Sequence, residues 1–215
     1  MMTNPPVRAD TPKARVVRCK IICRNTRMGR IVCVANQKGG VGKTTTASNV
    51  AAGLAKAGMQ TLLVDLDPQC NATTGLGGVP AKTHPLVSEA ALGENVMSTA
   101  VTNLSLLPGS RSVRDVERIA EQARAGSMVL SNHLSCGLNA WDYCLIDCPP
   151  SLGELTRTAL AGSTEVLMPI QCEYFALEGL TQMIEVIRDV MADQPGRLSF
   201  SGIVLTMHDA NLELT

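Results

Sequence analysis

The sequence predicts an α/β fold in which a mostly parallel sheet is flanked by helices. Short apolar runs of strand length alternate with longer segments of helical spacing, and glycine-rich turns separate them. A glycine loop also stands between the first apolar run and the first helical segment. The chain has 215 residues, of which 45% are hydrophobic and only 2% aromatic, so we expect one core of mainly aliphatic side chains.

The predicted elements follow one another as βα units. The first strand is 31–35, and the helical segment 44–56 follows it and ends before Gly58. Further strands are predicted where apolar, often β-branched runs are bounded by turn residues. These strands are 60–65, 104–107, 143–147, 165–170 and 200–206. Two more helices are predicted over 111–124, which is charged and amphipathic, and over 177–192.

The segment 36–45 has the features of a phosphate-binding loop, because a strand precedes it, a helix follows it and glycines fill its centre. Backbone N–H groups of such a loop surround phosphate oxygens, and the positive end of the next helix adds to the attraction. We expect Lys43 to reach the outer phosphates and Thr44 to ligate Mg²⁺. The predicted nucleotide contacts are Lys38, Gly39, Gly40, Val41, Gly42, Lys43, Thr44 and Thr45.

The loop departs from the strict pattern at its first position, where Gln37 replaces a glycine. A second lysine, Lys38, follows directly. One loop needs one lysine for the outer phosphates, so Lys38 has two interpretations. It is either a solvated loop lysine or a residue that reaches across a two-fold interface to the partner's nucleotide, as an arginine finger does.

Three aspartates complete the predicted site. Asp65 and Asp147 end two predicted strands, and in open α/β sheets ligands bind beyond the carboxyl ends of the strands. We expect both to lie beside the glycine loop and to hold the magnesium ion or its water together with Thr44. Asp67 lies two residues beyond its strand and is better placed to orient or activate the attacking water. The alternative for any one aspartate is a turn or helix cap.

Charge is unevenly distributed, although the net charge is zero. Residues 1–30 carry eight basic side chains against one acidic, and the mildly acidic remainder gives no argument for nucleic-acid binding. We therefore divide the chain into a basic extension, 1–28, disordered or non-native, and a folded domain, 29–215. The extension is interpreted as an arm that touches nucleic acid, as an organellar transit peptide, or, as we favour, as translated upstream sequence before a start at Met28.

The spacing of the cysteines and the length of the apolar runs indicate in which cellular compartment we expect the protein. The eight cysteines form no C-x₂-C pair, so no zinc site is predicted, and we expect mostly free thiols in a reducing cytoplasm. Basic residues interrupt the apolar stretch near the start, so no secretory signal is predicted, and no run reaches the length of a membrane span.

Four separated blocks resemble those of the ParA/Soj chromosome- and plasmid-partition ATPases, in family order over roughly residues 29–215. They are 30–79 with its loop and Leu-Val-Asp-Leu-Asp-Pro-Gln-Cys-Asn-Ala-Thr, 146–153, 169–180 and 202–207. The resemblance implies a P-loop ATPase with a deviant Walker A motif that holds two ATP molecules in a dimer. Lys38 then looks like the family's signature lysine acting in trans, and Lys43 like its phosphate lysine. Asp67 resembles its hydrolysis residue and Asp147 its magnesium-side aspartate.

The resemblance also implies partners. They are a second copy of the chain bound on ATP, non-specific DNA and a ParB-type centromere-binding protein, with no membrane, in a cytoplasmic, nucleoid-associated protein that partitions a chromosome or plasmid. Arg188 aligns with a residue that resembles the family's DNA contact, and its alternative is a solvated helix charge. Other functions left open are a MinD-like membrane-positioning ATPase, an iron–sulfur reductase of the nitrogenase iron-protein type using Cys136 and Cys172, and a truncated product without turnover.

Two departures from the family pattern lead to further expectations. Cys70 stands where the family usually has glycine, so a positive φ at this turn would strain it modestly. Family members continue beyond the equivalent of Thr215 with an adenine-side loop, closing strands and C-terminal helices. We therefore expect a chain that is incomplete at its C-terminus and exposes a sheet edge.

Overall fold

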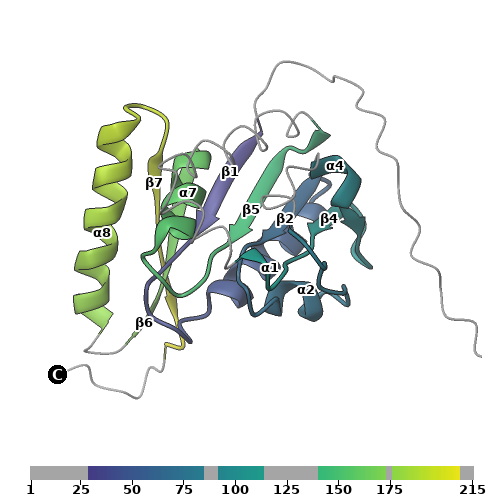
Figure 1. Ribbon diagram of the computed structural model, residues 1–215, viewed down its shortest axis with the longest axis horizontal. Coiled ribbons are helices and arrows are strands. Elements are labelled where there is room, and N and C mark those ends of the chain that lie inside the picture. Colours follow the sequence, from purple (N-terminus) through teal and green to yellow (C-terminus); the bar gives the residue numbers. More distant parts are fainter. Residues whose placement is uncertain (1–28, 85–91, 114–139, 173–175, 209–215) are drawn as a thin grey trace, which may run out of the picture.

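The fold is a seven-stranded sheet with helices on both of its faces (Figure 1). The computed structural model describes residues 29–84, 92–113, 140–172 and 176–208. The strands are β1 Arg30–Val34, β2 Thr61–Asp65, β3 Met97–Ser98, β4 Leu104–Leu107, β5 Tyr143–Asp147, β6 Glu165–Gln171 and β7 Ser199–Thr206. The helices are α1 Lys43–Lys56, α2 Asn71–Gly75, α4 Leu92–Asn95, α7 Glu154–Gly162 and α8 Ala176–Asp193.

The sheet has the strand order β3-β4-β2-β5-β1-β6-β7. All neighbouring strands are parallel except β3 and β4, which are antiparallel. The predicted α/β class with a mostly parallel sheet is therefore confirmed. The six predicted strands are all present with small shifts at their ends, whereas α2, α4, β3 and α7 were not predicted. Nearly all of the predicted helix 111–124 lies outside the described residues.

Alternate residues of each central strand face opposite layers, as the two-residue period of a strand requires. Ile31 and Cys33 of β1 point into a cluster that includes side chains of α7 and α8. Val34 points to the other face, where it meets three alanines of α1 that recur every four residues, Ala47, Ala51 and Ala55. Both faces of the central strands are buried, which explains why these strands read as continuous apolar runs.

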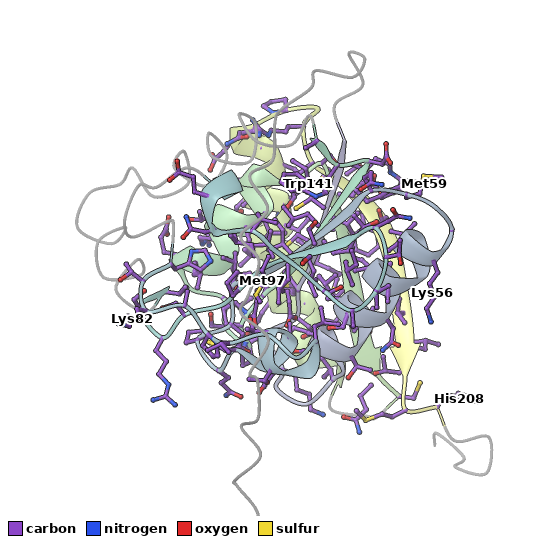
Figure 2. The ribbon with its side chains drawn as sticks, turned by 90° about the vertical axis from the view of Figure 1, so that its right-hand side faces the viewer. Lys56, Met59, Lys82, Met97, Trp141 and His208 are labelled. Atoms are coloured by element: carbon purple, nitrogen blue, oxygen red, sulfur yellow. The ribbon has the colours of Figure 1, made fainter. Side chains whose placement is uncertain are left out.

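Helix α1 presents small side chains to the sheet. These buried alanines allow the helix backbone to approach the strands closely. The helix ends as predicted: Gly58 adopts a left-handed φ of 92°, and its N–H donates to the carbonyl oxygen of Ala55. Polar side chains lie at the periphery, where Lys56 of α1 and Lys82 are exposed to solvent (Figure 2).

Strand β7 lies at one edge of the sheet, next to β6 (Figure 1). Phe200, Ile203 and Leu205 of this strand are exposed, so the described part of the chain has an apolar sheet edge, as predicted. Among the described residues, no helix combines the length and the apolar character needed to cross a bilayer.

Candidate active site

The glycine loop joins the end of β1 to the start of α1. Gly40 and Gly42 both have left-handed backbones, with φ of 76° and 84°, a region that residues with a Cβ rarely adopt. At Gly42 a Cβ would also meet the Thr206 side chain at 3.5 Å. Val41 between the two glycines is buried, and Gly39 is exposed. The backbone of the loop therefore depends on glycine at positions 40 and 42.

Contacts from β6 and β7 fix the loop from behind. The Asn36 side-chain amide donates to the carbonyl oxygen of Pro169 at 2.7 Å, and its Oδ1 accepts from the backbone N–H of Lys38 at 3.0 Å. The Thr206 hydroxyl donates to the carbonyl oxygen of Val41 at 2.9 Å. The sequence reasoning missed Asn36 and Thr206, because their partners are 133 and 165 residues away along the chain.

Lys43 begins α1 and is only 6% exposed. Its Nζ donates to the carbonyl oxygen of Lys38 at 2.8 Å, so the ammonium lies back over its own loop. Burial lowers the pKa of Lys43, and the negative charges of Asp147 and Asp67 oppose this shift. A desolvated lysine enclosed by the loop, with two carboxylates near it, suits the binding of phosphate oxygens.

Lys38, Thr44 and Thr45 complete the predicted nucleotide contacts. Lys38 is half-buried and uses both main-chain groups to hold the loop, accepting from Lys43 and donating to Asn36. Thr44 is half-buried and Thr45 is exposed in the first turn of α1. The trans role of Lys38 concerns a second subunit and stays a prediction.

The strand order brings the predicted aspartates to the edge of the sheet where the loop starts. Asp65 ends β2 and Asp147 ends β5, and the two residues are direct partners in the parallel pairing of these strands. Asp147 is also the partner of Val34, the last residue of β1 before the loop. The predicted grouping of Asp65, Asp147 and the loop is therefore present in the structure.

Asp147 is a fully buried carboxylate whose two oxygens have no hydrogen-bond partner in the described part of the chain. Burial raises the pKa of Asp147 to about 7, and the charges of Asp65 and Asp67 add to the shift. The Thr44 hydroxyl is near enough to favour the charged form but does not complete a hydrogen bond of normal geometry. A buried carboxylate without donors, beside a threonine hydroxyl, fits a hard divalent cation such as Mg²⁺.

Asp65 differs from Asp147 because protein donors occupy both of its oxygens. Oδ1 accepts from the backbone N–H of Asp67 at 3.1 Å, and Oδ2 accepts from the backbone N–H and the hydroxyl of Thr73 at 2.8 and 2.6 Å. Burial raises the pKa of Asp65, and the Thr73 hydrogen bonds oppose this shift. These contacts make Asp65 part of the turn into α2, and its role as a metal ligand stays a prediction.

Asp67 lies in the turn between β2 and α2 and is 6% exposed. Its Oδ1 accepts from the backbone N–H of Gln69 at 2.8 Å, and its carbonyl oxygen accepts from the N–H of Cys70 at 2.8 Å. Cys70 has a left-handed backbone, with φ of 58° and ψ of 34°. The condition under which the sequence predicts strain at Cys70, a positive φ at this turn, is thus met, and the cost of placing a residue with a Cβ there is about 1–2 kcal/mol.

The predicted DNA contact, Arg188, belongs to α8. Arg188 is exposed on α8 between Glu185 and Asp189, and Arg157 forms an ion pair of 3.7 Å with Asp189. An acidic neighbourhood does not favour a nucleic-acid contact. The DNA role of Arg188 stays a prediction.

The cysteines of the iron–sulfur alternative are only partly described. Cys136 lies outside the described residues, and Cys172 is half-buried after β6. The five described cysteines are free thiols, and two of them, Cys33 and Cys148, contact each other through their sulfur atoms at 3.3 Å.

Comparisons with known proteins agree with this geometry. Residues 29–200 match a family model described as an AAA domain. The chain is 42% identical to the sporulation initiation inhibitor protein Soj of Bacillus subtilis, over 87% of this chain and 76% of the relative. It is 44% identical to the chromosome-partitioning ATPase Soj of Treponema pallidum, over 87% and 75%, and 43% identical to the chromosome partitioning protein ParA of Myxococcus xanthus, over 87% and 68%.

Solved structures share the fold. A cobyrinic acid a,c-diamide synthase from Mycobacterium smegmatis with bound ADP and magnesium has a TM-score of 0.81 and 34% identity, and the match covers 86% of this chain and 77% of that one. A plasmid partition protein from Borrelia burgdorferi has a TM-score of 0.75, and the match covers 86% of this chain and 82% of that one. At 24% identity the second likeness shows the fold alone.

Proposed function

The chain belongs to the Soj/ParA family of chromosome-partitioning ATPases, and from this premise we propose that it is an ATP-dependent switch for partition. In this proposal the protein dimerises on ATP, binds DNA non-specifically and segregates a chromosome or plasmid. It works with a ParB-type partner in the cytoplasm, on the nucleoid. Hydrolysis of the β–γ phosphoanhydride ends the DNA-bound state.

One observation carries the proposal: a buried lysine and two buried aspartates meet at the end of the sheet where the glycine loop begins. Lys43, Asp67 and Asp147 are near enough for their charges to influence one another, although Asp147 ends β5 and Asp67 lies in the turn after β2. A structural core would rarely bury three charges together without a ligand to balance them. A nucleotide with its metal ion supplies both the phosphates for Lys43 and the cation for Asp147.

Residues of the loop would bind the triphosphate. The glycines at 40 and 42 have left-handed backbones, which would let the N–H groups of the loop surround phosphate oxygens, and the start of α1 would add its positive end. Lys43 would bind the outer phosphates in the subunit to which it belongs, with Thr45 at the rim of the site. The hydroxyl of Thr44 and the free carboxylate of Asp147 would hold the magnesium ion, with Asp65 as the further candidate.

When bound, the magnesium ion neutralises charge on the β- and γ-phosphates. Asp67 would orient the attacking water. Its Oδ1 accepts from the backbone N–H of Gln69, which holds the carboxylate in place, and its Oδ2 takes no part in that bond. Lys38 would complete the site of the partner subunit, where its ammonium stabilises charge that develops in the transition state.

The two lysines provide the test. Lys43→Ala should raise the dissociation constant for ATP at least 100-fold, or about 2.7 kcal/mol. Lys38→Ala should leave the affinity of the monomer within threefold but abolish ATP-dependent dimerisation and hydrolysis. Lys56→Ala is the matched control, because this exposed lysine ends the same helix. Fluorescent-nucleotide titration and sedimentation velocity measure the two properties, and equal loss of ATP affinity in both loop variants would contradict a trans role for Lys38.

A further inference from the structure

A chain of hydrogen bonds leads from the loop after β4 to the turn that carries Asp67. The backbone N–H of Gly109 donates to the Thr73 hydroxyl at 2.8 Å, and this hydroxyl donates to Oδ2 of Asp65 at 2.6 Å. Oδ1 of Asp65 in turn accepts from the backbone N–H of Asp67 at 3.1 Å. The Thr73 hydroxyl therefore uses its proton and one lone pair at once, as a relay does.

This network is closed to water and tightly packed. The side chains of Asp65 and Thr73 are fully buried. A Cβ added at Gly109 would come within 2.9 Å of the Asp65 carboxyl carbon and Oδ2, so the backbone at 109 lies directly against the carboxylate. The turn at Asp67, Thr73 of α2 and the loop at Gly109 thus enclose one carboxylate, and solvent has no access to replace a lost partner.

Asp67 depends on this arrangement for its position. The preceding strand ends at Asp65, and the chain then turns so that the N–H of Asp67 points back at the Asp65 carboxylate. A shift of the Asp65 carboxylate would move the main chain at Asp67 and the carboxylate that it carries. Lys43 begins α1 and the glycine loop follows β1, so the phosphate contacts of the loop and Lys43 do not depend on the Asp65 carboxylate.

We propose that Thr73 is a positioning residue for hydrolysis: through Asp65 it fixes the turn that aims Asp67 at the attacking water. This inference rests on the role of Asp67 proposed above. Misplacing a reacting group by about 1 Å can lower a rate 100-fold without changing affinity. The expected signature is therefore a loss in kcat with nucleotide affinity retained.

The test compares three variants of the full chain, which are Thr73→Val, Thr73→Ser and Thr61→Val. Thr73→Val keeps the side-chain shape but removes both hydroxyl bonds, and it should lower kcat for Mg²⁺·ATP at least tenfold with the ATP dissociation constant within threefold. Thr73→Ser keeps the hydroxyl and should retain kcat within threefold. Thr61→Val is the matched control, because it removes an equally buried hydroxyl at the opposite end of β2, where it bonds to the carbonyl oxygen of Met59 at 3.1 Å.

Two further variants keep the proposal open to refutation. Gly109→Ala pushes on the Asp65 carboxylate without removing a hydrogen bond, and it should also lower kcat at least tenfold, whether or not Thr73→Val folds. Asp67→Ala separates the two proposals: wild-type turnover in this variant refutes the proposed role of Asp67. If Asp67→Ala abolishes turnover while Thr73→Val or Gly109→Ala keeps it, the positioning role is wrong.

The double variant gives the last arm of the test. Adding Thr73→Val to Asp67→Ala should slow hydrolysis no further, because Thr73 acts through Asp67. An additional tenfold loss, or a loss of ATP affinity as large as the loss of kcat in Thr73→Val alone, would overturn the inference in favour of a purely structural role.

Discussion

Replacing Asp147 with asparagine should stabilise the metal-free protein at neutral and alkaline pH. The carboxylate is buried and has no hydrogen-bond donor among the described residues, so its charge is costly to the fold when no cation is bound. Asparagine has nearly the same shape and carries no charge at any pH. The substitution therefore removes a destabilising charge together with the proposed metal ligand.

The magnitude follows from the pKa of Asp147, which burial raises from its ordinary value of 3.8 to about 7 in the folded protein. Between these values the folded protein binds the proton more tightly than the unfolded chain does. The free energy of unfolding is thus unaffected by this group below about pH 4, and it falls as the pH rises toward 7. At 1.36 kcal/mol per pKa unit, the gap of about 3 units corresponds to up to about 4 kcal/mol, which is fully lost above pH 7.

Urea denaturation followed by circular dichroism, in EDTA and without nucleotide, measures this effect. The stability of Asp147→Asn minus that of the wild type should grow by about 2–4 kcal/mol between pH 4.5 and pH 8. Any cost of burying asparagine is independent of pH and cancels in this comparison. Glu185→Gln on the exposed face of α8 is the control and should follow the wild-type curve. Parallel curves for Asp147→Asn and the wild type would refute the reasoning, as would stabilisation of Asp147→Asn by Mg²⁺·ATP equal to that of the wild type.

The other predictions concern the turn after β2. Asp67→Ala should lower kcat at least 100-fold with an unchanged ATP dissociation constant, which would trap an ATP-bound dimer on DNA; stopped-flow phosphate release measures this, and loss of ATP binding would contradict the assignment. Cys70→Gly should change the free energy of unfolding by less than about 1 kcal/mol, because relief of the left-handed strain is offset by chain entropy and the lost buried thiol. Cys70→Val should lose about 2 kcal/mol, since a β-branched residue is an outlier at positive φ, and equal stability of the valine and cysteine forms would show that the turn is not strained.

Local patterns were sufficient for much of the fold and part of the site. The glycine loop, the helix that follows it and its end at Gly58 depend on residues within a few positions of one another, so they could be predicted from the sequence. Helix α7 was missed because its nine residues include two threonines and a glycine, which are weak helix formers, and its stability comes from burial of Leu155 and Leu160 against the sheet.

The sequence by itself determined which residues end the strands: Asp65 and Asp147 follow apolar runs, and parallel strands bring their carboxyl ends to one edge. Only the tertiary structure decided that β5 inserts between β1 and β2 and that the Asp147 carboxylate is buried there without a donor, whereas Asp65 accepts from three donors that follow it within eight residues. The different environments of these two aspartates depend on Thr73, on Gly109 and on desolvation by the whole sheet. Contacts between distant segments leave no periodic pattern in the sequence, because pairing and burial are settled only when the strands assemble.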